Sequence, residues 1–385
     1  MNKVFKRMDK LLLITSIVLM IIGVVSIYSA SSVYSVLSKG EDSNHYLVRQ
    51  CIFIGFAFLF SLIFIFKLKW HKKKPLVYAL LVFIIVALVG LLFSDFTINN
   101  AKSWYQLGFF NFQPSEFAKP ILILSMAAYY DSLIGNNEKR WYMYLVPFVV
   151  AAVMAYLIYE QPDLGGAIII VLLVTLVFFS IPYNKYVRRR NNTIVGGAII
   201  ICAMLALLVG PHVLNQYQLK RFEFTAPCTR YTESTGYQVC NGQIAIKNGG
   251  LTGLGFGNST QKYLYLPEAH TDFIFPIICE EVGILGGIAV LVLYLLMLYS
   301  ILRIAKDAST VYDSIVAYGT FVYLTIHILV NLLGVTASMP LTGVPLPLLS
   351  YGGSFNICVI ALLFVCQRIA MDSKKAKIKE NIKKL

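Results

Sequence analysis

Ten long apolar runs constrain the fold of this chain more than any other feature of its sequence. The chain has 385 residues, of which 58% are hydrophobic and only 14% are charged. A helix needs about 20 mostly apolar residues to cross the hydrocarbon layer of a membrane. We therefore predict an all-α polytopic membrane protein with about ten transmembrane helices. The predicted spans lie near residues 11–31, 47–66, 76–94, 114–131, 143–159, 164–181, 194–211, 273–301, 314–335 and 351–369.

Lysine and arginine residues alternate with the predicted spans. They precede the first span, follow the second, fourth, sixth and eighth, and crowd the segment after the tenth. Because basic loops stay on the cytoplasmic side, we predict one membrane domain over 1–385 with both termini cytoplasmic. A large extracellular loop would occupy 213–272 and a basic cytoplasmic tail 370–385. The net charge of +14 is then explained by attraction to anionic membrane lipid, and it requires no nucleic acid as a partner.

The cysteines divide between the spans and the large loop. Five of the seven lie within predicted spans, whereas Cys228 and Cys240 both lie in the 213–272 loop. An extracellular loop is an oxidising setting, so these two are candidates for a disulfide bond. Two unpaired thiols in a reducing habitat are the alternative. No spacing of cysteine and histidine resembles a zinc site.

The second half of the large loop, residues 245–258, is rich in glycine. A nucleotide-binding loop would follow a strand and end in Gly-Lys-Ser or Gly-Lys-Thr, and this segment does neither. We interpret it as a segment whose backbone packs closely at the membrane surface.

Titratable residues gather where the large loop becomes the span 273–301. Glu268, His270 and Asp272 lie within the segment LPEAHTDFIF. Ionisable groups at membrane depth are costly and usually face a cavity or a pathway, which makes this segment the first candidate site. For Asp272 the alternative role is that of N-cap of the following helix.

Other polar residues lie at the predicted outward ends of earlier spans. Glu116 and Lys119 are one turn apart near the start of a span, where they could face a pathway or simply neutralise each other. Asp163 precedes the next span and could act as its N-cap. Trp104 lies in the outward loop before Glu116.

The last outward loop, residues 339–353, contains Ser350 among several prolines and glycines. This composition predicts a rigid, non-helical segment. Such a segment is tolerated at membrane depth only if protein buries it or if it lines a cavity. A site would therefore open outward, since the cytoplasmic side offers only basic anchors.

Five ordered motifs extend over nearly the whole chain. They are QPSEFAK at 113–119, QPDLG at 161–165, GYQ followed by AIKNGGLTGLGFGNSTQK within 236–262, LPEAHTDFIF at 266–275 and PLTGVPLPLLSYGGS at 340–354. Together they resemble the FtsW/RodA/SpoVE family, also called SEDS. The pattern YLPEAHTDF, with Tyr265, is closer to the division-type members FtsW and SpoVE than to RodA. The segment before Trp104 departs from the family pattern, with Lys102 as a possible substitute for an arginine-like substrate contact.

The resemblance implies a peptidoglycan glycosyltransferase of the bacterial cytoplasmic membrane, acting in cell division or cell shape. It would polymerise lipid II, a disaccharide-pentapeptide on undecaprenyl diphosphate, at the outer face. The family's essential aspartate matches Asp272. Inverting transfer from a glycosyl diphosphate needs a base for the attacking GlcNAc 4-hydroxyl but no acid for the leaving group. One carboxylate can then suffice, unlike the pair used in glycoside hydrolysis.

The departing diphosphate requires positive charge nearby. Lys119, Lys262, Arg221 or a divalent Mg or Mn ion could supply it, and the sequence does not choose among them. Trp104 would offer a flat face to a sugar or a lipid head. The candidate substrate-binding residues are Trp104, Glu116, Lys119, Asp163, Arg221, Lys262, Glu268, His270 and Ser350.

The resemblance also implies a partner, a class B penicillin-binding protein with transpeptidase activity. Two other functions stay open. One is a flippase or transporter of the lipid-linked precursor, since such proteins combine many spans with intramembrane charge. The other is a non-catalytic scaffold for the penicillin-binding protein, which would tolerate the loss of Asp272.

Overall fold

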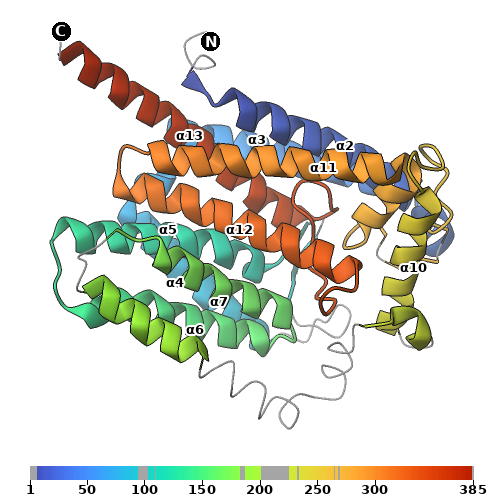
Figure 1. The fold of residues 1–385 in the computed structure, drawn as a ribbon, viewed down its shortest axis with the longest axis horizontal. Helices are drawn as coiled ribbons and strands as arrows, with labels where there is room; N and C mark the ends of the chain where they lie inside the picture. The colour runs from blue at the N-terminus through green and yellow to red at the C-terminus, as the bar shows by residue number, and fades with distance from the viewer. Residues whose placement is uncertain are drawn as a thin grey trace.

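Long helices that run along a common axis make up most of the protein (Figure 1). The structure is a computed structural model that describes residues 7–93, 103–108, 110–182, 187–200, 225–231, 234–263, 265–267 and 269–383. The α-helices are α2 (Lys10–Tyr34), α3 (His45–Phe60), α4 (Lys74–Leu92), α5 (Pro114–Gly135), α6 (Val146–Tyr159), α7 (Leu164–Phe179), α10 (Ser234–Gly249), α11 (Ile274–Asp307), α12 (Val311–Val335) and α13 (Gly353–Lys383).

Short elements extend or connect these helices. Two π-helical segments, η1 (Ser35–Lys39) and η2 (Ser61–Lys67), continue α2 and α3. Three 3-10 turns are η3 (Trp70–Lys72), η4 (Trp141–Leu145) and η5 (Pro227–Arg230). The strands β1 (Tyr105–Leu107) and β2 (Phe110–Phe112) pair antiparallel just before α5.

The predicted spans agree with the helices of the described residues. Eight of these helical segments are long and apolar enough to cross a membrane, and each coincides with one predicted span. The predicted span 164–181 coincides with α7, which has only 16 residues. Of the predicted span 194–211, residues 194–200 are helical and the rest lies outside the described residues. The chain is thus an all-α polytopic membrane protein.

Both termini lie at one end of the bundle, which we call the terminal end (Figure 1). Here Asp9 accepts a hydrogen bond from Leu12 N and forms an ion pair with Arg303 of α11. The backbone of Asp9 exchanges two hydrogen bonds with the Gln367 amide of α13. Burial opposes ionisation of Asp9, but the hydrogen bonds from Leu12, Ser300 and Arg303 outweigh it and hold the pKa of that carboxyl below its ordinary value. The ionised carboxylate therefore joins α2 to α11, and the backbone of Asp9 adds α13.

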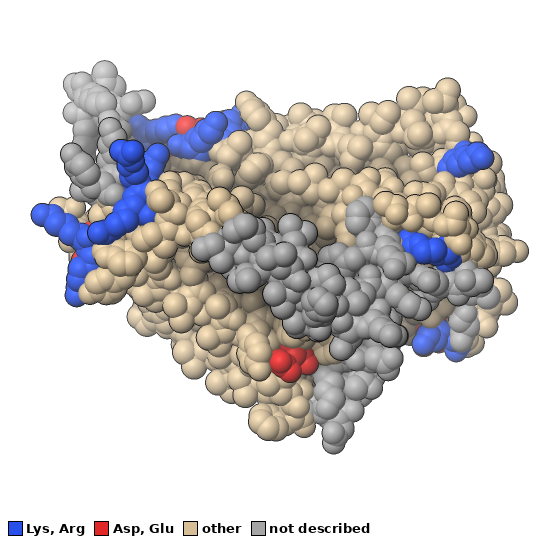
Figure 2. All heavy atoms as spheres, turned by 60° about the horizontal axis from the view of Figure 1, so that its bottom comes forward, with Lys and Arg blue, Asp and Glu red and all other residues tan. Residues whose placement is uncertain are grey.

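Charged side chains avoid the middle of the bundle surface. Figure 2 shows one face on which Lys and Arg gather toward the two ends of the long axis, and the described surface between them is almost uncharged. Many large apolar side chains are exposed there in the absence of a partner, for example Leu285 and Leu295 on α11. A membrane-embedded surface requires such an apolar band.

The backbone of α11 is interrupted at Gly283, where φ is +78°. The glycine-rich segment of the large loop supplies the hydrogen bonds that the break removes. The N–H groups of Leu254 and Gly255 donate to the carbonyls of Glu280 (2.9 Å) and Glu281 (3.0 Å). A Cβ at Gly283 would lie 2.3 Å from a carbonyl oxygen of this segment, so only glycine fits. The close backbone packing predicted for 245–258 is present, and α11 is its partner.

The end of the bundle opposite the termini, the loop end, is crossed by α10 (Figure 1). A disulfide bond joins Cys228 in η5 to Cys240 in α10. A Cβ at Gly242 would lie 3.1 Å from the ring of Phe273, so α10 is braced directly against the start of α11. The residue before Phe273 is Asp272, which places α10 beside the first candidate site.

Candidate active site

Two segments far apart in the sequence form the centre of the site at the loop end. Ser350 donates its hydroxyl hydrogen to the carbonyl of Thr271 (2.7 Å). The N–H of Tyr351 donates to the carbonyl of His270 (2.9 Å). Residues 270–272 are therefore hydrogen-bonded along the non-helical segment 340–351, as expected if that segment is held by protein.

Asp272 lies two residues before α11 and is half-buried. The helix begins at Ile274 with Phe273, not Asp272, in the N-cap position, and the Phe273 side chain makes no capping hydrogen bond. The alternative that Asp272 serves as this N-cap is therefore wrong. Instead, the Asn331 side chain of α12 donates to the carbonyls of both Asp272 (2.9 Å) and Val344 (2.8 Å). The buried Asn331 amide thus fixes the backbone of Asp272 against the last loop.

Gly343 is the residue of the last loop that approaches the carboxylate of Asp272. Its φ is +70°, and a Cβ at this position would lie 3.2 Å from Asp272 Oδ2. The missing side chain leaves room at the carboxylate, and the backbone conformation is one that other residues adopt at a cost.

We expect Gly343→Ala to lower the polymerisation activity that the family resemblance implies by about tenfold or more, because the added methyl group would push the carboxylate out of position. The matched control is Gly40→Ala, where φ is +65° and a Cβ would meet nothing within 4 Å. Both variants should lose a similar stability, about 1 kcal/mol, in thermal unfolding. Equal activities of the two variants would show that the space beside Asp272 has no role.

The His270 side chain is buried among aromatic rings. Its ring centroid lies 4.4 Å from that of Tyr46, 5.5 Å from that of Tyr34 and 5.7 Å from that of Tyr351. Burial raises the pKa of the Tyr351 hydroxyl, and a nearby Arg49 acts in the opposite direction through its charge and a side-chain hydrogen bond. Arg49 is exposed, so it adds a cation to this side of the site.

Asp163 lies at the same end of the bundle, in the turn before α7. Its carboxylate caps α7 by accepting a hydrogen bond from Gly166 N (2.8 Å). The next residue but one, Gly165, approaches the last loop so closely that a Cβ there would lie 3.2 Å from the carbonyl oxygen of Thr342. Asp163 therefore holds the turn that supports the loop beside Asp272.

Trp104 lies before β1 and is partly exposed. Its neighbour Ser103 donates to the carbonyl of Gln161 (3.1 Å), and the Gln161 side chain donates to the carbonyl of Leu88 (3.0 Å). These bonds attach the Trp104 segment to the turn that carries Asp163. The segment that carries Trp104 therefore belongs to the loop end.

Glu116 and Lys119 form an ion pair inside the bundle. The ammonium lies 2.6 Å from Glu116 Oε1, and Lys119 is only 1% exposed. Tyr323 and His327 of α12 lie within electrostatic range of this pair. Because an isolated charge is very costly to bury, each partner depends on the other.

Lys262 is also buried, and its contacts lie on α2, on α11 and within the large loop. Its ammonium donates to the Glu281 carboxylate (3.3 Å) and forms no other ion pair in the described part of the chain. It also donates to Ser29 (3.1 Å) on α2 and to the carbonyl of Gly257. These bonds attach the large loop to α2 and α11, which is a structural role.

Three residues proposed from the sequence lie outside the part of the chain that the structure describes. They are Arg221, Glu268 and Lys102. Within the described ranges, no group of three or more His, Cys, Asp and Glu side chains could hold a metal ion.

Sequence reasoning missed several residues of this site. From the sequence, Gly343 is only one residue of a predicted rigid loop. Its position between Pro340 and Pro345 is the feature that could have indicated its importance. Arg49, Tyr46 and Tyr34 come from α2, α3 and their surroundings, more than 200 residues before Asp272. No local pattern relates them to it.

The fold and site define a polytopic membrane protein with a partly exposed carboxylate at one end of its helix bundle. The model of the FtsW/RodA/SpoVE family, described as "Cell cycle protein", matches residues 9–375. The chain belongs to the FtsW/RodA/SpoVE family.

Known relatives resemble the chain over almost its full length. The probable peptidoglycan glycosyltransferase FtsW of Bacillus subtilis (strain 168) is 33% identical, covering 99% of this chain and 94% of the relative. Stage V sporulation protein E of the same organism is 32% identical, covering 95% and 98%.

Solved structures share the fold. A chain from a study of the structural coordination of polymerization and crosslinking by a peptidoglycan synthase complex aligns with a TM-score of 0.74 at 27% identity, covering 95% of this chain and 98% of that one. The rod shape determining protein RodA of Thermus thermophilus aligns with a TM-score of 0.67 at 27% identity, covering 95% and 97%.

Proposed function

We propose that this peptidoglycan glycosyltransferase polymerises lipid II at the outer face of the cytoplasmic membrane, with Asp272 as general base. The observation that carries the proposal is the half-buried Asp272 carboxylate at the loop end, held by Asn331 against the last loop. The names of the FtsW relatives support the reaction class. The basic residues of the terminal end support the orientation, since cations favour the cytoplasmic side.

In this mechanism Asp272 accepts the proton of the GlcNAc 4-hydroxyl as that oxygen attacks the anomeric carbon of the second substrate. The new glycosidic bond forms as the bond from that carbon to the diphosphate oxygen breaks, with inversion. The electron pair leaves with undecaprenyl diphosphate, which needs no proton. A base held by packed backbone is already oriented for this transfer, which lowers the entropic cost of the step.

The diphosphate requires a cation, and the contacts of the candidate residues favour Arg49 over Lys119 and Lys262. Lys119 and Lys262 each face a carboxylate in a buried ion pair, so their charge is already balanced. Arg49 is exposed and contacts Tyr351 beside His270. We assign Arg49 as a further diphosphate contact, because a guanidinium binds phosphate oxygens in pairs. Because no described cluster fits a metal, no step is assigned to one.

The partner of this reaction is proposed to be a class B penicillin-binding protein. The related peptidoglycan synthase complex couples polymerization with crosslinking, which supports a transpeptidase beside this chain.

The test is a polymerisation assay with purified full-length protein and lipid II, with and without the penicillin-binding protein. Glycan polymer on gels is the expected product. Translocation of fluorescent lipid II in liposomes without any polymer would instead establish a flippase. A chain that binds its partner but makes no polymer in either assay would be a scaffold.

A further inference from the structure

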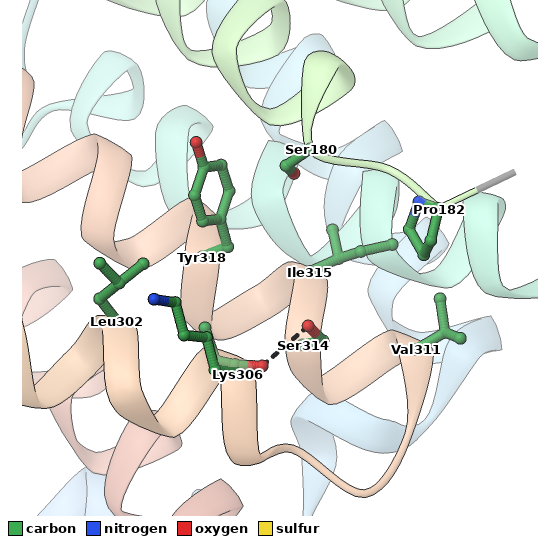
Figure 3. Close-up of a pocket in the computed structure, with 9 residues that line it drawn as sticks. Ser180, Pro182, Leu302, Lys306, Val311, Ser314, Ile315 and Tyr318 are labelled. Carbon is green, nitrogen blue, oxygen red and sulfur yellow. Dashed lines mark hydrogen bonds between the residues drawn. The ribbon is translucent and has the colours of Figure 1, made fainter. Parts of the chain in front are cut away.

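A cavity lies at the terminal end, away from Asp272 (Figure 3). Its volume is about 180 Å³, and it lies between the end of α7, the last turns of α11 and the first turns of α12. The walls are mostly apolar, with Leu302, Val311 and Ile315 among them. Ser314 donates to the carbonyl of Ala305 (2.9 Å), which joins α12 to α11 across the cavity. The established reaction makes no use of this cavity.

One cation belongs to the cavity. Figure 3 shows the Lys306 side chain directed into the space beside Leu302 and Tyr318. Charged residues beside Lys306 on α11 are already paired, since Arg303 pairs with Asp9 and Asp307 pairs with Lys377 of α13. Lys306 forms no ion pair with any residue that the structure describes. Its ammonium therefore remains available to an external anion.

The surface of α11 leads directly from the membrane to this cavity. Its exposed apolar residues recur at intervals of three and four, so they form one stripe along the helix. After the break at Gly283 the stripe consists of Leu285, Ile288, Val292, Leu295 and Tyr299, all between 47% and 66% exposed. The same spacing continues through Leu302 to Lys306. A ligand that follows this stripe must be apolar along its length and anionic at its end.

We propose that the cavity binds an anionic phospholipid of the cytoplasmic leaflet, with its phosphate on Lys306 and an acyl chain along the stripe of α11. Phospholipid is the occupant because the stripe is continuous with the membrane-facing surface, and because basic pockets between cytoplasmic helix ends suit lipid head groups. The leaflet follows from the orientation proposed above. Lipid binding itself does not depend on Asp272 or on polymerisation.

Native mass spectrometry of the full-length protein tests the proposal, with mixed micelles that contain phosphatidylglycerol and phosphatidylcholine in equal amounts. We expect the wild type to retain phosphatidylglycerol preferentially. Lys306→Gln should lower that retention about fivefold. Val311→Trp, which fills the mouth of the cavity from the first turn of α12, should lower retention of both lipids. The matched control is Lys139→Gln, which removes the charge of an exposed lysine outside the cavity.

Three results would overturn the proposal. Equal retention by Lys306→Gln and the wild type would remove the phosphate contact, and an equal loss in Lys139→Gln would indicate general charge attraction. Displacement of phosphatidylglycerol by inorganic phosphate alone would indicate an anion site without a lipid. Thermal unfolding of each variant, measured alongside, separates a lost ligand from a lost fold. Polymerisation activity is not a readout here, so this test can fail while the proposed function holds.

Discussion

Asp272→Asn is expected to lower the rate of lipid II polymerisation by about 10²–10⁴-fold, the usual contribution of a general base. Asparagine keeps the shape of the side chain but cannot accept a proton from the sugar hydroxyl. The fold should be preserved, because the hydrogen bond from Asn331 goes to the backbone carbonyl of Asp272 rather than to its side chain. Gel analysis of glycan products, with the penicillin-binding protein present, measures the effect.

The control for this variant is Asp42→Asn, which removes one negative charge from an exposed residue in the loop after α2. Its activity should equal that of the wild type. Binding of the penicillin-binding protein should be unchanged in both variants. Polymer formation by Asp272→Asn at the wild-type rate would eliminate the proposed mechanism, and it would return the scaffold and flippase hypotheses to consideration.

Lys119→Met should have the second large effect, on stability as well as activity. The change leaves Glu116 buried without its cation, and breaking a buried pair in this way costs about 3–5 kcal/mol. We expect a clear drop in the melting temperature in detergent. Because the pair lies within electrostatic range of His327, which is one turn before Asn331 on α12, its loss should reduce polymerisation too.

The double variant Glu116→Gln/Lys119→Met separates structure from catalysis. Removing both charges should recover most of the stability, since the remaining groups are neutral. If the pair serves only the fold, activity recovers with stability. If Lys119 contacts the diphosphate, the double variant stays inactive although it is stable. A melting temperature of Lys119→Met equal to that of the wild type would contradict the burial on which this prediction rests.

The spans could be predicted from the sequence because a membrane helix requires only a run of about 20 mostly apolar neighbouring residues. Eight predicted spans match apolar helices, and the positions of Pro114 and Asp163 at helix starts agree with the preference of these residues for such positions. The π-helical extensions and the break of α11 at Gly283 could not be predicted. Leu251 of the glycine-rich segment occupies the space beside Gly283, and no pattern in the sequence around Gly283 indicates that contact.

The candidate site was predicted only in part, because its members come from separate helices. The motif around Asp272 indicated a carboxylate at the membrane edge. The same reasoning grouped Lys262 with the site, whereas the structure pairs it with Glu281. Charge alone could not distinguish a cation that is free to bind a diphosphate from one that is held in a buried ion pair, because the partner carboxylate is known only from the fold. Arg49 went unnoticed for the same reason.

By itself, the sequence determined that this chain crosses the membrane many times, which end of the bundle is basic, and which short motif carries the titratable residues. Each of these depends on neighbouring residues and on the solvent around them. The tertiary structure decided that Asn331 and Gly343 meet Asp272, that Lys119 and Lys262 are already neutralised, and that Lys306 has no ion-pair partner among the described residues. Those facts depend on how separate helices pack, because packing alone brings residues distant in sequence within hydrogen-bonding range.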